Sequence, residues 1–271
     1  MNPRKTCAFA LAASALVLLS SGSAWAGAWP TTAGTVDTIT SISDMTSSSP
    51  AAGQVIQGSN SFEKFEVSPL ISYGLTDSTT VQVQPRWQQL TARDVNGNTT
   101  RTSGFSDLEV AGRFRLWSDD QTGSVFSVQP LVSLPTGYDP DRQPALGSGH
   151  PDYEMRALYG TNLNILGLPA FFDGELAYRA RTGPPADEAK LDLTLGVRPD
   201  DKWMLLAQSF TTLTVGNAGQ GYQPYKISKL EFSVVRSLTD HISLQFGYEF
   251  SPYYENLGSE NTWLGGVWVS F

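Results

Sequence analysis

Apolar and polar residues alternate along runs of about ten residues, and this periodicity restricts the chain more than any other feature. In residues 241–252, Ile242, Leu244 and Phe246 share one face, whereas the polar residues between them share the other. The same pattern recurs in residues 81–88, 108–116 and 191–198. Successive side chains of a strand point to opposite faces, and no run of helical period follows residue 26. The sequence therefore predicts an all-β chain.

The connections between these runs alternate in length. Short turns fall at residues 75–79, 117–123, 166–170, 198–202 and 237–241. Longer polar loops fall around residues 94–103, 136–150, 182–189, 216–224 and 255–259. Transmembrane barrels have this rhythm, because their periplasmic turns are short and their outer loops are long. We therefore predict a transmembrane up-and-down antiparallel β-barrel of about twelve strands.

The strand count depends on the N-terminal part of the chain. Counting back from a last strand at residues 261–271, about eleven strands fit, the first near Phe62–Tyr73. An even number requires one more strand, for which Thr35–Ser43 is the candidate. Residues 27–60 are rich in Ser, Thr and Gly, so they form either this first strand or a small plug, and a plug would leave about ten strands after re-pairing. Residues 61–271 form the barrel itself.

The N-terminus has the organisation of a secretory signal peptide. Two basic residues, Arg4 and Lys5, precede an apolar run that is short for an anchor helix. Small residues ending in Ala26 follow it, so we expect a leader of residues 1–26 that signal peptidase removes after Ala26. The one cysteine, Cys7, leaves with this leader, and the exported chain then has no thiol or disulfide chemistry.

Charge and hydropathy exclude several classes of protein. The formal net charge is −8, so the chain has no electrostatic reason to bind nucleic acid. Beyond the leader, no apolar run reaches the length of a transmembrane helix. Aromatic residues are frequent near the predicted strand ends, as in the girdles of membrane barrels. Alternation also places Trp117 and Trp268 on the inward face, where they can stack on a ring-bearing solute or pack the barrel floor.

No residue pattern predicts a cofactor, a metal site or a catalytic centre. Two distant histidines, His150 and His241, do not provide a set of transition-metal ligands. Ser148 beside His150 at the outer rim is the one arrangement of nucleophile and base worth testing. An outer-membrane lipid hydrolase that uses this pair is therefore an alternative function.

Three motifs follow one another between residues 104 and 160. They are a Gly-hydrophobic-x-Asp-Leu strand, a Leu-Pro-Thr-Gly turn and a Gly-x-Gly-x-x-Asp strand opening, at residues 104–108, 134–137 and 147–152. This segment resembles the phenol-degradation meta-pathway family of outer-membrane β-barrel proteins. The resemblance implies a barrel that passes small, often hydrophobic or aromatic compounds, and it brings no catalytic residues with it.

The polar faces of the predicted strands carry charges of both signs. If the apolar faces contact lipid, these side chains line the lumen. The predicted lining residues are Arg86, Glu109, Arg113, Arg115, Glu154, Arg156, Glu175, Arg179, Arg181, Asp192, Arg198, Glu231 and Glu249. Two arrangements remain open: an ion-pair network that fills a narrow interior, or a charge-lined constriction that selects solutes. Both can coexist if the network leaves a gap.

The C-terminal strand ends in an aromatic residue after alternating hydrophobic residues. Gly266, Val269 and Phe271 resemble the strand that the barrel-assembly machinery recognises in bacterial outer-membrane barrels, although Leu264 departs from that pattern. We therefore expect a monomer that contacts outer-membrane lipid in a Gram-negative bacterium. The expected function is a channel or importer that passes small solutes, hydrophobic or aromatic ones among them, by passive diffusion. A sealed structural or adhesive barrel is the main alternative.

Overall fold

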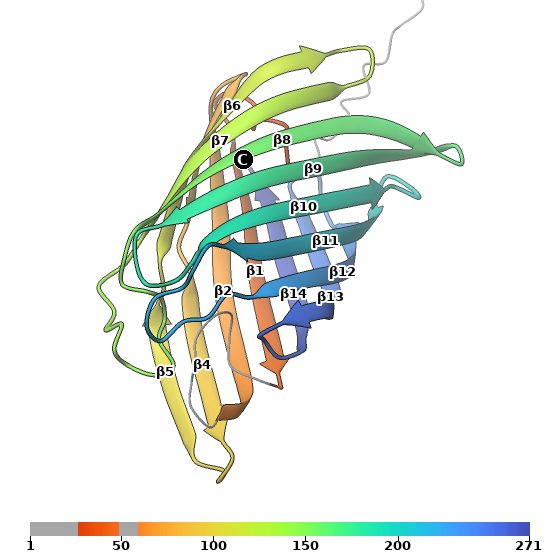
Figure 1. The fold of residues 1–271 in the computed structure, drawn as a ribbon. Coiled ribbons are helices and arrows are strands. Elements are labelled where there is room, and N and C mark those ends of the chain that lie inside the picture. The colour runs from red at the N-terminus through yellow and green to blue at the C-terminus, as the bar shows by residue number, and fades with distance from the viewer. Residues whose placement is uncertain (1–26, 49–58) are drawn as a thin grey trace, which may run out of the picture.

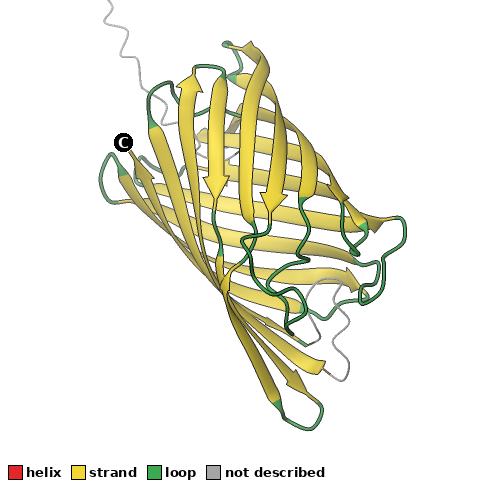
Figure 2. Cartoon of the chain, turned by 90° about the vertical axis from the view of Figure 1, so that its left-hand side faces the viewer, coloured by secondary structure: helices red, strands yellow, loops and turns green. Residues whose placement is uncertain are grey.

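The computed structural model describes residues 27–48 and 59–271, and this part of the chain folds into one antiparallel β-sheet. Figure 2 shows strands and loops but no helix in the described part. None of its segments is a helix long and apolar enough to cross a membrane. The strands, labelled in Figure 1, are β1 (Val36–Ser47), β2 (Ser59–Thr76), β3 (Thr79–Gln84), β4 (Trp87–Asp94), β5 (Thr99–Phe105), β6 (Leu108–Asp119), β7 (Ser124–Leu134), β8 (Asp152–Ile165), β9 (Leu168–Arg181), β10 (Asp187–Val197), β11 (Trp203–Val215), β12 (Lys226–Ser237), β13 (Ile242–Glu255) and β14 (Glu260–Ser270). The predicted signal peptide, residues 1–26, lies outside the described residues.

Twelve of these strands close into a barrel, because β1 pairs with both β2 and β14. The register places Val36 opposite Tyr73 on one side of β1, and Asp37 opposite Ser270 on the other. Phe271 N donates to Val36 O at 2.9 Å, so the last residue also holds the first strand. Closure satisfies the backbone of every strand in the ring, which a membrane interior requires. The predicted all-β barrel of about twelve strands is confirmed.

Strands β4 and β5 form a hairpin outside this ring. The long strand β2 pairs with β3 near the end that carries the short turns, and with β4 near the end that carries the long loops. Pro85 separates β3 from β4, and proline has no N–H to continue the ladder. On one side of this break β3 pairs with β6. On the other side β4 pairs with β2 along one edge and with β5 along the other. The predicted loop at residues 94–103 is therefore wrong in its second half, which begins strand β5.

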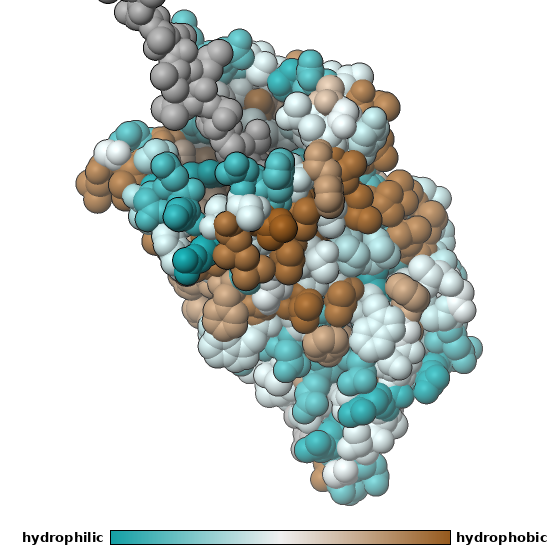
Figure 3. All heavy atoms as spheres, turned by 180° about the vertical axis from the view of Figure 1, so that it is seen from behind, coloured by the Kyte–Doolittle hydropathy of each residue, from teal (hydrophilic) through white to brown (hydrophobic). Residues whose placement is uncertain are grey.

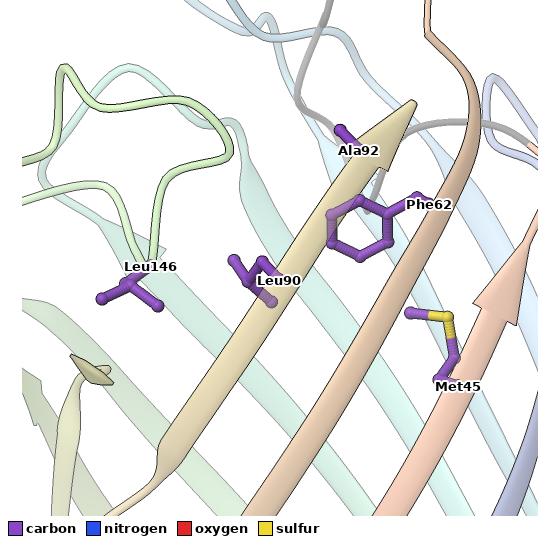
Figure 4. Close-up of a cluster of buried hydrophobic side chains, with 5 residues drawn as sticks. All are labelled: Met45, Phe62, Leu90, Ala92 and Leu146. Carbon is purple, nitrogen blue, oxygen red and sulfur yellow. The ribbon is translucent and has the colours of Figure 1, made fainter. Parts of the chain in front are cut away.

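Residues 135–151, the long loop between β7 and β8, cover the other edge of β5. Ser106 Oγ donates to Leu146 O at 2.6 Å, and Thr136 Oγ1 donates to Phe105 O at 3.1 Å. Leu146 also points into the barrel, where it packs in a buried apolar cluster with Met45, Phe62, Leu90 and Ala92 (Figure 4). This loop therefore closes the wall beside β5 and narrows the outer mouth.

The outward faces of the strands form an apolar surface. Leu176, in the middle part of β9, is 62% exposed, whereas its neighbour Ala177 is 4% exposed because it faces inward. Figure 3 shows apolar residues gathered across the middle of one face of the molecule, with polar residues beyond them. An apolar belt of this extent, with alternating inward polar residues, is the surface that lipid contact requires.

A register shift between Arg115 and Trp117 changes the alternation near the end of β6. Such irregularities occur where one strand has an extra residue, so side chains beyond them change face. Trp117 is exposed, and the prediction that it faces the lumen is wrong. Trp268, on β14, is buried and lines the lumen.

Candidate functional site

One side of the lumen, formed by β6 to β10, holds an ion-pair network centred on Arg156. The Arg156 guanidinium lies 2.9 Å from Glu154 and 2.7 Å from Asp192, and it also pairs with Glu175. The register explains this position, because Glu175 lies directly opposite Asp192 on the neighbouring strand. Like charges placed opposite each other destabilise a sheet. Arg156 therefore neutralises a pair of acids that the register forces together.

Arg179 extends the network across the barrel. Its guanidinium lies 2.8 Å from Glu154 and 2.7 Å from Glu109, which lies on β6. The second oxygen of Glu109 accepts from Arg86 at 2.6 Å, at the break between β3 and β4. These contacts connect β6 with β9, which are not neighbours in the sheet, so the charges extend into the lumen on this side rather than lie along one strand.

The network continues toward the outer end through Lys190 and Arg181. Lys190 lies 3.0 Å from Glu154 and 3.3 Å from Glu188. Arg181 lies 2.8 Å from Glu188 and 3.2 Å from Asp152. The carboxylates are buried, and a buried charge is tolerated only when it is paired and hydrogen-bonded. This side of the lumen is therefore filled by mutually neutralised charges.

The remaining predicted lining residues lie outside this network. Arg113 is buried and donates to Gln129 Oε1 at 2.9 Å and to Trp29 O at 3.1 Å. Within the described part of the chain, Arg113, Arg115 and Arg198 form no ion pair, and Arg198 follows the end of β10. Glu231 and Glu249 face the opposite side of the lumen.

The residues before β1 enter the barrel at the end with the short turns. Ala28 is fully buried; its N donates to Asp173 Oδ2 at 2.6 Å and its O accepts from Ser127 Oγ at 2.6 Å. Trp29 Nε1 donates to Gly123 O at 3.1 Å, and the indole meets the ring of Phe171 edge-on. The N-terminal part predicted as strand or plug thus contains both a strand, β1, and a segment that packs inside the barrel.

A cavity of about 370 Å³ lies beside the network, on the side of the lumen formed by β11 to β14, β1 and β2. The walls of this cavity are amphipathic, because the inward positions of these strands carry both apolar and polar side chains. The lining residues are Ile39, Ser41, Ser43, Met45, Lys64, Glu66, Phe171, Thr194, Met204, Leu206, Gln208, Phe210, Lys229, Glu231, Gln245, Glu249, Thr262, Leu264 and Trp268. The lumen is therefore asymmetric, with paired charges on one side and an amphipathic cavity on the other.

The cavity has its own charged groups. Lys64 lies 3.4 Å from Glu66, and Lys229 lies 3.2 Å from Glu249 and 2.6 Å from Glu260. These pairs lie on different strands from the network around Arg156, and no ion pair among the described residues connects the two groups. The charges of the cavity can therefore act on a solute independently of that network.

The outer mouth is fixed by Tyr138, in the loop between β7 and β8. Its hydroxyl donates to Asp107 and accepts from Gly149 N at 3.1 Å. Burial and the hydrogen bond to Asp107 raise the pKa of the Tyr138 phenol above its ordinary value. Gly137 and Gly149 have φ values of 93° and 76°, which favour glycine. The motifs around these residues therefore anchor the loop to the barrel wall.

Ser148 and His150 lie in the same loop, but the hydrogen bonds between them involve the backbone of His150. His150 N donates to Ser148 Oγ at 3.3 Å, and Ser148 Oγ donates to His150 O at 3.5 Å. A nucleophile requires a base whose ring nitrogen accepts its proton, and these bonds do not supply one. Among the described residues, no group of three or more His, Cys, Asp or Glu side chains is placed to hold a metal ion.

Sequence reasoning did not identify Trp29, Phe171 or the apolar residues of β11 as parts of the lumen. Met204 and Leu206 are buried there, although alternation alone assigns apolar residues to the lipid side. One signal was present: Trp203–Leu206 is a run of apolar residues, so both faces of this strand had to be apolar. Gly160 gave no such signal in the sequence; the structure shows that it leaves room for Trp29, because a Cβ there would lie 2.5 Å from the Trp29 ring.

The closed antiparallel barrel, its apolar outer face and its polar interior together define an outer-membrane β-barrel. Residues 22–263 match the family described as the MetA-pathway of phenol degradation, and the chain belongs to that family.

Solved structures show the same fold. The crystal structure of an outer membrane channel from Pseudomonas putida F1 superposes with a TM-score of 0.71 at 15% identity, covering 90% of this chain and 98% of that one. The translocator domain of the autotransporter NalP from Neisseria meningitidis gives a TM-score of 0.52 at 12% identity, covering 89% and 90%. The beta domain of the Bordetella autotransporter Brka gives 0.53 at 10%, covering 88% and 100%. No curated protein matches the sequence.

Proposed function

We infer that this protein is an outer-membrane channel that passes small solutes by passive diffusion. The observation that carries this function is the asymmetry of the lumen. Paired charges occupy one side, and a cavity of about 370 Å³ follows the strands on the other. A barrel that served only as a scaffold would have no need of an amphipathic cavity beside an already satisfied network. The similarity to an outer membrane channel supports the same conclusion.

The walls of the cavity favour solutes that are partly apolar. Leu206, Phe210 and Trp268 supply apolar and aromatic surface, whereas Gln208 and Gln245 supply hydrogen-bonding groups. Ligand sites combine a largely apolar lining with a few polar groups in this way. Small aromatic or hydrophobic compounds with one polar group therefore fit the pathway better than sugars do.

Location and assembly are part of the proposal. Export after cleavage at Ala26 delivers the chain to the outer membrane of a Gram-negative bacterium as a monomer. The assembly machinery recognises the last strand, in which Gly266, Val269 and Phe271 carry the signal; Phe271 is exposed at the end of β14. Deleting Phe271 should reduce the barrel yield in cells while leaving refolding in detergent unchanged, and equal yields in cells would contradict this role.

Solute flux tests the function directly. Liposomes containing the refolded protein should take up phenylalanine, an aromatic zwitterion that crosses lipid slowly, faster than protein-free liposomes, and should exclude a disaccharide. Heat-denatured protein provides the control for leakage. Uptake equal to that of empty liposomes would support the alternative of a sealed structural or adhesive barrel.

A further inference from the structure

Two buried carboxylates of the described residues have no Lys or Arg within ion-pair distance. The other buried acids, such as Glu109, Glu154 and Glu260, all pair with a cation. The exceptions are Glu231, which faces the cavity, and Asp173, which faces the main chain of Gly27 and Ala28. The ionised form of a buried carboxylate without a cation is costly, so each of these groups either holds a proton or is a site where a cation outside the described residues can bind.

Glu231 lies among groups that are already engaged. Gln245 Nε2 donates to its carboxylate at 3.3 Å, and Trp268 Nε1 donates to the carbonyl of the same glutamine at 2.9 Å. Lys229, two residues away on the same strand, is held by Glu249 and Glu260. Glu249 also lies directly opposite Glu231 across the strands, so it adds a like charge. The local field around Glu231 is therefore negative and attracts a cation.

The surroundings of Glu231 also define the rest of the ligand. Leu206, Phe210 and Trp268 line the same cavity and present apolar and aromatic surface. Aromatic rings attract cations as well as apolar groups. Resting on the channel function above, we propose that Glu231 selects small organic cations, binding their ammonium group while an apolar or aromatic body lies against these three side chains.

Ligand binding to the refolded barrel in detergent tests this proposal without any need for conductance. Benzylammonium should bind with a Kd at least about tenfold below that of benzyl alcohol, which has the same ring and no charge, and of benzoate, which has the opposite charge. Glu231→Gln should remove this preference. Glu63→Gln is the matched control, because that carboxylate lies on β2 beside the cavity wall but is exposed and does not line the cavity; it should change the Kd by less than about threefold.

The outcomes separate this proposal from the channel function. Equal Kd values for benzylammonium and benzyl alcohol, or equal losses in the two Gln variants, would overturn the assignment of Glu231. Selective binding of benzylammonium without solute flux would support the Glu231 site and refute the channel function. Solute flux without a preference for benzylammonium would support the channel function and refute the Glu231 site. The comparison of ligands on the wild type stands even if Glu231→Gln fails to fold.

The surroundings of Asp173 support a second, independent inference. It lies on β9 and is 3% exposed. A Cβ on Gly27 would lie 2.2 Å from Asp173 Cγ and Oδ2, so the main chain of Gly27 rests directly against the carboxylate. Glu175 is two residues along the same strand and is already paired with Arg156. Arg113 on β6, which forms no ion pair within the described part of the chain, is bound to Gln129 and to Trp29 O.

Removal of the leader would supply the missing cation. Hydrolysis of the Ala26–Gly27 peptide bond consumes one water and leaves a carboxylate on Ala26 and a protonated amine on Gly27. The geometry points to an ion pair between this new α-ammonium and Asp173, which fixes the N-terminal segment inside the barrel only after cleavage. A residue larger than glycine would displace the carboxylate at this position, because its Cβ would overlap it, and the φ of 92° also favours glycine.

The reactivity of the α-amine in the mature protein tests this ion pair. An amine-reactive acetylating reagent should modify the Gly27 amine at least about tenfold more slowly in the wild type than in Asp173→Asn, since a paired ammonium is rarely deprotonated. Asp120→Asn, at an exposed turn, is the matched control and should not change the rate. Lys202, also exposed, provides the reference amine within each sample.

A chain with one extra serine before Gly27 is a second variant that leaves the barrel untouched. Its displaced α-amine should react at least as fast as Lys202, because an exposed α-amine is more often deprotonated than a lysine side chain. A wild-type amine that reacts at the rate of Lys202, an unchanged rate in Asp173→Asn, or a mature chain that begins elsewhere than Gly27 would each overturn the inference.

Discussion

Arg156 shows how one side chain determines the stability of this lumen. It contacts three acids, two of which the sheet register places directly opposite each other. Removal of one partner from a buried ion pair is more harmful than replacement of the whole pair, because it leaves charges without compensation. The charged side of the lumen is therefore held together by interlocking pairs, in which Arg156 is the least replaceable member.

Arg156→Ala should lower the free energy of unfolding by about 3–5 kcal/mol. Arg115→Ala is the control, since Arg115 is half-buried and forms no ion pair within the described residues; it should change the free energy by less than about 1 kcal/mol. Urea unfolding in detergent measures both values. A similar loss in the two variants would show that the pairs around Arg156 contribute no more than an ordinary surface arginine.

Tyr138 controls the outer mouth at the same scale. Tyr138→Phe should speed trypsin cleavage after the exposed Arg142, because the loop loses its hydrogen bonds to Asp107 and Gly149. Tyr153→Phe, which alters an exposed tyrosine on β8, should have no effect. The folded protein raises the pKa of Tyr138, so the stabilisation is complete below about pH 10 and is lost as the pH rises above it. Cleavage at pH 8 that is equal in wild type and Tyr138→Phe would contradict this anchor.

At the scale of the elements, the period of two predicted the strands and the rhythm of short and long connections. Pairing that breaks this rhythm could not be predicted. Pro85 interrupts one ladder, but the sequence does not indicate that β4 then stays with β2 while β6 stays with β3. The register shift between Arg115 and Trp117 could not be predicted either. One extra residue in a strand moves the side chains beyond it to the opposite face of the sheet, and composition does not reveal it.

The residues of the charged network could be predicted from the sequence, but their pairing could not. The acids and bases of β8 to β10 were found by alternation, since most inward positions there are charged or small, with Leu158 and Phe171 as exceptions. Which acid meets which base depends on register, which a single sequence does not determine. The entry of Ala28 and Trp29 into the barrel depends on contacts with Asp173, Ser127 and Gly123, all distant along the chain.

The lipid-facing assignment of β9 can be tested with two leucines. Leu176→Arg should lower the free energy of unfolding in lipid vesicles by about 2–4 kcal/mol, because the cation would lie in the apolar belt. Leu166→Arg, at the turn before the same strand, should cost less than about 1 kcal/mol. Equal costs would show that the middle of β9 does not face lipid.

In the whole molecule, the two sides of the barrel interior differ in structure. The side formed by β6 to β10 is filled by paired charges that stabilise the wall. The other side keeps the cavity. The loop between β7 and β8 narrows the outer mouth, and the segment before β1 packs into the opposite end. We therefore propose that a solute that crosses this barrel passes along β11 to β14, and that the charged network supports the wall.

Single-channel conductance of two neighbouring variants on β11 tests this claim most directly. Leu206 is 6% exposed and lines the cavity, whereas Leu205 is 46% exposed and faces outward, so Leu206→Trp and Leu205→Trp add the same side chain to opposite faces. With the path along the cavity, Leu206→Trp should reduce the wild-type conductance to less than about half in planar bilayers, and Leu205→Trp should leave it unchanged. Equal conductance in wild type and both variants would contradict a path along the cavity, because solute would then be crossing the barrel elsewhere.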